Sequence, residues 1–417
     1  MLLLLGCFYH LYSQIDQLED RCVTYYPKEI QPFENWLQAK EDFGIANIDE
    51  VYRIPVVIHI LHMGEPIGEG TNLSDEVVQS QLAVINQDFR REAGTRGYNE
   101  HPAGGDAKIE FVLAERAPDG SQTSGIVRID VTEEELPTGI GNALLLSAHF
   151  SYWNSEHYLN IWSMPWLPEN TLLGVARFPE SDLPGLPDES QEGWNLPGIG
   201  EVDGVVVNAH HFGKTDATGP YHLGRTLTHE LGHFLGLFHV WGPNDLDADG
   251  CDLDDFCTDT PPTRARVSGC PTDLLACDGR PAMVENYMDY ADDACMNIFT
   301  QDQIRRMRTV LENSPRRKSL INSPATGPIL DLPDELFGTV NIYPNPVSDR
   351  LIISINNHRQ NTVRIQLHDM RGRVILDREV SYFGEEIEVL IPPITERILI
   401  LTVISGEFSY RQKLLMK

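Results

Sequence analysis

His229-Glu-Leu-Gly-His233-Phe-Leu-Gly236-Leu-Phe-His239 is the stretch of this sequence that decides its fold and its chemistry. In a helix, residues four positions apart lie on one face, so His229 and His233 can bind the same metal ion. Glu230 borders that site, where it can act as the general base toward a zinc-activated water. Gly236 permits a left-handed turn that brings His239 back as the third ligand. Three protein ligands leave the fourth zinc position to water, as catalysis requires.

This pattern predicts a secreted zinc-dependent endopeptidase, although other functions compete with it. A bare HExxH motif also occurs on ordinary helices, and a lone histidine is usually a core or surface group. A purely structural zinc site would be closed by four protein ligands, usually including cysteine. The remaining alternative is a surface adhesin or binding protein with a vestigial metalloprotease domain. The intact Glu230 and the three intact histidines favour the enzyme.

Strand and helix patterns alternate around this motif. Residues 52–61 are rich in β-branched residues and predict a buried strand. Residues 71–91 predict an amphipathic helix with Ser74 as its N-cap. Further strands are predicted at 109–114, 158–162, 172–178 and 204–207, and further helices at 221–238 and 300–311. The alternation predicts an α/β (α+β) catalytic domain with a mixed twisted sheet and an active-site helix, followed by a loop-rich subdomain held by disulfides.

The ends of the chain differ in character from this central part. The first residues contain a short apolar run typical of a signal peptide that lacks its positive n-region, and Leu4-Leu5-Gly6-Cys7 also resembles a lipoprotein box. Short strand patterns near the C-terminus, separated by turn signals, predict a small all-β sandwich. The predicted segments are a signal peptide (1–14), a prosegment (15–50), the catalytic domain (51–313), a linker (314–337) and the sandwich (338–417).

Composition narrows the possible partners. The chain has 417 residues with 32 Lys and Arg against 62 Asp and Glu, a formal charge of −30. Such a surface repels nucleic acid and anionic membranes, but it is compatible with basic peptides or Ca²⁺. Beyond the first residues, no stretch is long and apolar enough to predict a transmembrane segment. We expect a monomer that acts on protein or peptide substrates.

Five of the seven cysteines lie between positions 251 and 295, among loops rich in Gly, Pro and Asp. This density predicts disulfides formed in an oxidising compartment. Because five is an odd number, at least one thiol of the group is left over, and spacing alone does not settle the pairing.

The extended zinc motif resembles that of the metzincin metalloproteases, which also carry a methionine turn downstream. Asn286-Tyr-Met288-Asp-Tyr290 matches such a turn. Together with Gly224-Arg-Thr-Leu-Thr, Asp259-Thr-Pro-Pro and Asp293-Ala-Cys-Met-Asn-Ile-Phe-Thr300, it makes residues 50–312 resemble the pappalysin family. The resemblance implies that Met288 forms the floor of the site and that Tyr290 hydrogen-bonds the tetrahedral intermediate. It also implies that strand 172–178 is an edge strand that takes an extended substrate.

The same resemblance implies two disulfides, Cys251–Cys277 and Cys270–Cys295, which leave Cys257 unpaired. It implies a Ca²⁺ site in the aspartate-rich loop, with Asp255 and Thr260 as candidate ligands. The alternative for this loop is a solvated acidic surface. Some relatives prefer a basic residue after the cut, and Asp292 and Asp293 lie near the expected pocket, but the sequence leaves specificity open.

Arg21-Cys22-Val-Thr24 resembles the Arg-Cys-Gly-Thr sequence of pappalysin-type prosegments, with Val23 in place of glycine. The resemblance predicts that the Cys22 thiolate occupies the zinc of a latent form until cleavage between Lys40 and Arg53 releases it. The alternatives are a Cys22–Cys257 disulfide and a free thiol.

The C-terminal segment resembles the type A sorting domain of the type IX secretion system, on the residues Asn341-Ile-Tyr-Pro-Asn-Pro346, Asp369-Met-Arg-Gly-Arg373 and Lys413-Leu-Leu-Met-Lys417. It implies a Gram-negative bacterium of the Bacteroidetes type, with export through the periplasm to the cell surface or the medium by that secretion machinery. The alternative is an ordinary carbohydrate- or protein-binding sandwich.

Overall fold

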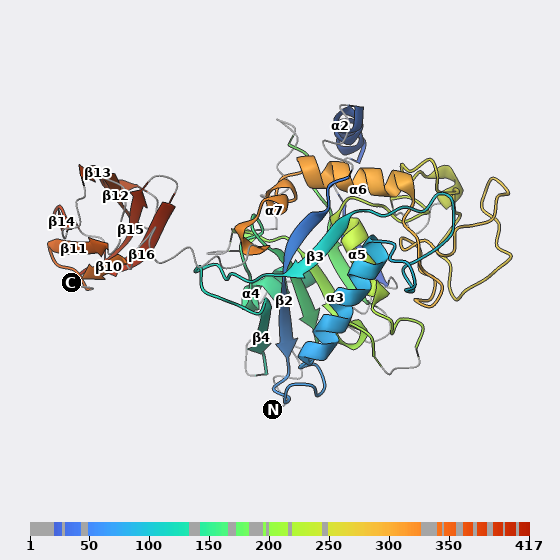
Figure 1. Cartoon of the computed structure of the whole chain (residues 1–417), viewed down its shortest axis with the longest axis horizontal. Helices are drawn as coiled ribbons and strands as arrows, with labels where there is room; N and C mark the ends of the chain where they lie inside the picture. Colours follow the sequence, from blue (N-terminus) through green and yellow to red (C-terminus); the bar gives the residue numbers. More distant parts are fainter. Residues whose placement is uncertain are drawn as a thin grey trace. The chain divides into compact units, whose positions relative to one another are not determined.

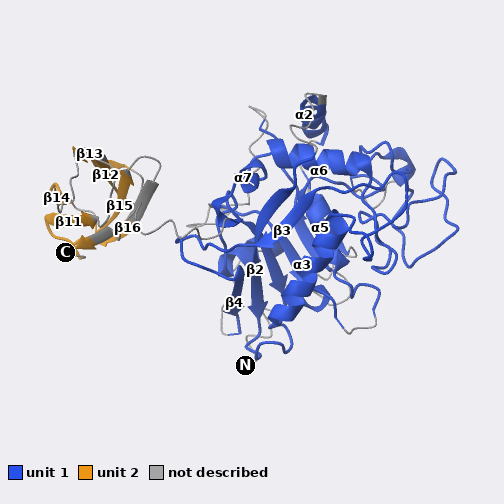
Figure 2. Cartoon of the chain, viewed as in Figure 1, with its two compact units in different colours: residues 1–327 blue, residues 328–417 orange. Residues whose placement is uncertain are grey.

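The computed structural model describes residues 21–26, 30–42, 49–132, 142–165, 172–182, 195–196, 200–215, 219–243, 249–326, 340–343, 346–355, 362–369, 373–381, 387–394, 397–405 and 408–417. Two compact units divide the chain, residues 1–327 and residues 328–417, and each is described by itself (Figures 1 and 2). The predicted signal peptide lies outside the described residues.

Unit 1 is built on a seven-stranded mixed sheet with the order β1-β6-β9-β5-β2-β3, in which β4 pairs with the far end of β2. Every pairing is parallel except β6 with β9. The strands are β1 (Cys22–Tyr25), β2 (Tyr52–His62), β3 (Ile109–Leu113), β4 (Ile126–Asp130), β5 (Leu159–Met164), β6 (Gly174–Arg177) and β9 (Val205–Asn208), beside the small hairpin of β7 (Asn195–Leu196) and β8 (Gly200–Glu201). This confirms the predicted mixed α/β fold.

Helices cover the sheet on both faces, which explains why its central strands are apolar at successive positions. Val205 and Val207 pack in the core that holds α3 (Asp75–Phe89) and α5 (Arg225–Phe234), whereas Val206 packs in a second core with α4 (Ala143–Phe150). Figure 1 shows α3 and α5 together against the sheet. The α4 segment was not predicted, because it is apolar nearly throughout and carries no helical periodicity.

Helix ends follow the expected local chemistry. Ser74 caps α3 by accepting a hydrogen bond from the Val77 amide, as predicted. Thr300 begins α6 (Gln301–Asn313) with a capping box. The active-site helix α5 is shorter than the predicted 221–238 at both ends, because Gly224 lies at φ +83° just before it and Gly236 at φ +92° turns the chain away after it.

Unit 1 extends beyond the predicted start of the linker at 314. The reason is a buried ion-pair cluster in which Arg316 and Arg317 both contact the Asp203 carboxylate, and Arg317 also donates to the Phe234 carbonyl at 2.8 Å. Two short helices follow α6 there, α7 (Lys318–Ile321) and η3 (Pro324–Thr326). Residues 314–326 therefore pack with the catalytic unit, and the rest of the predicted linker lies outside the described residues.

Two other segments of unit 1 frame the site. Residues 249–298 are loops with one short helix, η2 (Gly250–Asp252), and two disulfides joining Cys251 to Cys277 and Cys270 to Cys295. These are the pairs that the resemblance implies, and Cys22 and Cys257 are buried and form no disulfide. The predicted prosegment contributes β1 and the helix α2 (Ile30–Asp42), which packs on α6 (Figure 1).

Unit 2 is the predicted all-β sandwich. Two antiparallel sheets, with the orders β10-β11-β14 and β13-β12-β15-β16, share one apolar core (Figure 2). The strands are β10 (Val340–Tyr343), β11 (Arg350–Ile355), β12 (Thr362–Asp369), β13 (Val374–Ser381), β14 (Ile387–Leu390), β15 (Ile398–Ser405) and β16 (Phe408–Leu415). Across both units, the described residues include no helix long and apolar enough to cross a membrane.

Candidate active site

Three imidazoles converge in the interior of unit 1. The Nε2 atom of His233 lies 3.1 Å from Nε2 of His229 and 3.1 Å from Nε2 of His239. Tetrahedral zinc with bonds of about 2.0 Å separates its ligand nitrogens by about 3.3 Å. Both distances from His233 are thus close to the spacing that a single zinc ion requires, and one ring nitrogen of each histidine lies within 4.8 Å of the others.

Backbone carbonyls fix the orientation of two of these rings. Nδ1 of His229 lies 2.7 Å from the Tyr287 carbonyl, and Nδ1 of His233 lies 2.8 Å from the Leu237 carbonyl. Nδ1 must carry the proton in such contacts, so each Nε2 lone pair is free to bind a metal. Burial lowers the pKa of His233 to about 3, and burial together with neighbouring imidazoles lowers the pKa of His229 and His239 well below the usual value. The neutral rings fit a metal ion.

Glu230 faces the same space from α5. Burial raises its pKa to about 8, against the opposing effects of a hydrogen bond from Cys22 and the charge of Arg21. Gly174 of β6 lies directly over this carboxylate, and any side chain at that position would collide with it. A glycine inside a strand indicates such a close approach, so Gly174 is the sequence signal for this contact.

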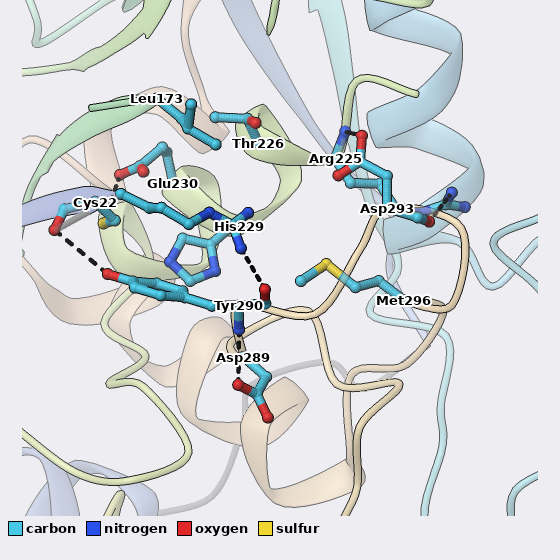
Figure 3. A pocket seen from close by; sticks show the side chains of 11 residues that line it. Cys22, Leu173, Arg225, Thr226, His229, Glu230, Asp289, Tyr290, Asp293 and Met296 are labelled. Carbon is cyan, nitrogen blue, oxygen red and sulfur yellow. Dashed lines mark hydrogen bonds between the residues drawn. The ribbon is translucent and has the colours of Figure 1, made fainter. Parts of the chain in front are cut away.

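The methionine turn lies beneath the helix. Met288 is fully buried, and a side chain at Gly232 would collide with its sulfur, so the turn packs directly against α5. Tyr290 packs edge-on to His239, and its hydroxyl donates to the Cys22 carbonyl at 3.4 Å (Figure 3). Tyr290, which is predicted to hydrogen-bond the reaction intermediate, thus contacts a backbone carbonyl of the N-terminal segment.

Cys22 lies at the centre of the site. Its Sγ atom and one ring nitrogen of each histidine all lie within 4.8 Å of one another, and it donates to Glu230 Oε2 at 3.3 Å (Figure 3). The thiol is held there because β1 extends the sheet along the edge of β6, with Cys22 paired to Gly174. Three imidazoles and a thiol are a donor set that suits zinc.

A pocket lies beside His229, and Arg21 is one of the residues that line it. The Arg21 guanidinium lies 3.3 Å from the centre of the Tyr221 ring and donates to the Tyr290 carbonyl. Asp293 and Met296 line the same pocket (Figure 3). The sequence did not identify Arg21 or Tyr221 as site residues, although Arg21 directly precedes Cys22, which it did identify.

Asp293 is only partly satisfied within this pocket. Its Oδ2 accepts hydrogen bonds from the Leu223 and Arg225 amides. Its Oδ1 is buried and has no hydrogen-bond partner among the residues that the structure describes. The second candidate acid of the sequence, Asp292, does not line the pocket.

The predicted calcium ligands, Asp255 and Thr260, are in contact with each other. Thr260 Oγ1 lies 2.8 Å from both carboxylate oxygens of Asp255, and burial raises the pKa of Asp255 to about 7. Within the described ranges, the group formed by Cys22 and the three histidines is the only one with three or more His, Cys, Asp or Glu ligand atoms close enough to share a metal ion.

These contacts place the chain among the metallopeptidases, and its glycine turn and methionine floor place it in the metzincin class. The sequence profile of the family described as pregnancy-associated plasma protein-A matches residues 147–312, and that of the secretion system C-terminal sorting domain matches residues 341–417. An extracellular metalloprotease of Arthroderma otae is 31% identical over 255 residues, which are 61% of this chain and 76% of that protein.

Solved structures agree. Promirolysin of Tannerella forsythia, in a mutant form, is 32% identical with a TM-score of 0.57, and the match covers 70% of this chain and 90% of that one. Mature mirolysin in complex with a cleaved peptide is 35% identical with a TM-score of 0.54, covering 67% and 100%. The chain therefore belongs to the pappalysin family of metalloproteases. It is a secreted or cell-surface protein of the Bacteroidetes type, and its sorting domain addresses it to the secretion machinery.

Gly236→Ala tests the turn that positions the third histidine. At φ +92° a side chain is strained, and the added Cβ would lie 2.8 Å from Val310 Cγ2. We expect the free energy of unfolding to fall by about 1–3 kcal/mol and metal retention against a chelator to weaken. Gly279→Ala is the matched control, because Gly279 shares the positive φ but has no atom within 4 Å of such a Cβ. Equal losses in the two variants would contradict the positioning role.

Proposed function

We propose that the chain is a zinc endopeptidase in which His229, His233 and His239 hold the metal and Glu230 is the general base. The observation that carries this proposal is the convergence of three neutral imidazoles beside a buried carboxylate. When bound, zinc supplies Lewis-acid chemistry for water and for the substrate carbonyl. The vestigial-site alternative is not favoured, because every member of the constellation is present and oriented.

The protein side chains divide the remaining work. Glu230 Oε2 now accepts a hydrogen bond from the Cys22 thiol, and in an open site the same atom would accept a proton from water. Tyr290 would donate a hydrogen bond from its hydroxyl to the oxygen on which negative charge develops. The present contact of that hydroxyl with the Cys22 carbonyl supports this role.

Glu230→Ala should lower kcat/KM for peptide cleavage by about 10²–10⁴ while zinc stays bound, because the carboxylate moves a proton and the histidines hold the metal. Metal content and turnover of the processed protein should be measured together. His233→Ala provides the contrast, since it should lose both. Near-normal turnover in Glu230→Ala would refute the assignment of the base.

We also propose that the pocket beside the histidines takes a basic side chain of the substrate. Arg21 lines it and stacks on Tyr221 as a cation–π pair. Asp293 lines it too, and its Oδ1, which has no hydrogen-bond partner among the described residues, is an acceptor that a guanidinium or ammonium group could satisfy.

A peptide library cleaved by the processed protein should show Arg or Lys at one fixed position next to the cut. Tyr221→Leu, which keeps bulk but removes the aromatic face, should weaken that preference about three- to tenfold. Cleavage without enrichment of basic residues at any position would exclude this specificity and leave the peptidase proposal intact.

The prosegment is proposed to hold the enzyme latent through Cys22. Its Sγ lies among the imidazoles, its carbonyl engages Tyr290, and its strand covers the edge of β6. The thiol thus stands where water must bind, and the neighbouring backbone closes the substrate edge. The alternative of a Cys22–Cys257 disulfide does not match the structure, in which neither cysteine is disulfide-bonded.

Cys22→Ala should make the unprocessed chain cleave peptides without a lag under non-reducing conditions, because the thiol no longer fills the metal position. Cys257→Ala removes the other buried free thiol and should keep the lag. Progress curves of the freshly purified variants give the measurement. Identical lags in Cys22→Ala and the parent would rule out the thiol as the block.

Calcium at Asp255 and Thr260 and a monomeric state stay predictions. Their contact places one carboxylate and one hydroxyl together, fewer oxygens than the six to eight that Ca²⁺ takes.

A further inference from the structure

The prosegment has a second contact with the catalytic unit, away from the zinc ligands. Helix α2 buries Phe33, Trp36 and Leu37 against an apolar surface of the catalytic unit. That surface is formed by Phe178, which follows β6, by Phe238, which precedes the third histidine, and by Val310 of α6. The surface therefore joins the end of the edge strand, the segment before the third histidine and α6.

A buried ion pair lies at the centre of this contact. Both Arg306 terminal nitrogens donate to the Glu34 carboxylate, at 2.6 and 2.5 Å, in a two-point arrangement. The two side chains are 3% and 8% exposed, and the guanidinium lies 5.0 Å from the centre of the Phe238 ring. Within the described residues, Glu34 is the only carboxylate that pairs with Arg306. A charge pair this enclosed is costly to break from one side, because the remaining ion is left buried.

Arg306 also connects this contact to the zinc site. Its Nε donates at 2.5 Å to the carbonyl of Gly236, the residue that turns the chain toward His239. The prosegment carboxylate therefore holds an arginine that itself holds the metal-binding turn. At the rim, Trp36 Nε1 donates to Asp182 at 2.6 Å, beyond the edge strand.

We propose that the surface formed by Phe178, Phe238, Arg306 and Val310 is a binding site for the released prosegment. It recognises the acidic and aromatic face of α2, with Glu34 between Phe33 and Trp36. Cleavage before β2 then yields a non-covalent complex that keeps the site closed without help from the Cys22 thiol, and activity awaits dissociation of the fragment. This inference rests on the proposed function only for its consequence, because the binding itself requires no catalysis.

Four observations favour this occupant. It is a segment of the same chain, it is seated on the surface, its charge matches the buried arginine, and residues 49–51 between it and β2 are exposed. The β1 strand alone, with four residues, offers a much smaller contact than β1 and α2 together.

The test uses the full chain carrying Glu230→Ala, to prevent autolysis, and Cys22→Ala, to remove the thiol. A recognition sequence for a site-specific protease replaces residues 49–51. After complete cutting, gel filtration and mass spectrometry follow the N-terminal fragment over time. We expect the fragment to elute with the catalytic unit, and Glu34→Gln to speed its release about a hundredfold.

Matched variants separate recognition from folding. Asn35→Ala changes an exposed neighbour on the same helix and should release the fragment at the parental rate. Trp36→Phe, which keeps an aromatic ring but loses the hydrogen bond to Asp182, should have a smaller effect than Glu34→Gln. A single cooperative thermal transition of each uncut chain, even at a lowered midpoint in Glu34→Gln, shows that the catalytic unit is folded.

Loss of the fragment from the parental protein within the column dead time would overturn the proposal, as would equal release rates for Glu34→Gln and Asn35→Ala. Retention in the inactive background does not depend on whether the chain cleaves peptides. A failure of the proposed function would instead appear as absent turnover in the Glu230-containing protein after the fragment has been removed.

Discussion

Neutral imidazoles buried in one cluster are the constraint on which the rest of unit 1 depends. Three such rings in the protein interior would repel one another if protonated, and burial already disfavours their charged form. Two rings satisfy Nδ1 through backbone carbonyls, and the chain has to place those carbonyls. One carbonyl belongs to the methionine turn and the other to the turn after α5. The hydrogen bonds that the two rings require therefore fix the positions of both segments.

Helix α6 and the segment after it organise the chain around the end of α5. Its Arg306 reaches the Gly236 carbonyl, and beyond its end Arg317 reaches the Phe234 carbonyl, so two arginines hold the end of α5 and the turn that follows. Both guanidiniums are buried and paired with carboxylates. Such pairs add little net stability over apolar packing, but they specify one geometry, which a metal site needs.

The sequence predicted what depends on local spacing. The histidine and glutamate positions, the Gly236 turn, the Ser74 and Thr300 caps and the main strands follow from periodicity and capping rules. It missed what depends on distant partners. Arg21 became informative only when the fold placed it on Tyr221, and Arg306 only when it met Glu34, 272 residues away in the chain. The predicted linker begins too early, at 314. Its prolines indicated a linker, but Arg316 and Arg317 pair with the distant Asp203 and hold this segment to unit 1.

The direction of β1 has a consequence for how this edge tells one chain from another. β1 runs parallel to β6, so Arg21, which lines the side pocket, precedes the residue at the histidines. A chain added to β6 in the opposite direction would bring to that pocket a residue that follows the one at the histidines, and the order of its peptide NH and carbonyl groups along β6 would be reversed. Two peptides of identical composition can therefore make different contacts on one strand, according to the direction in which each chain runs.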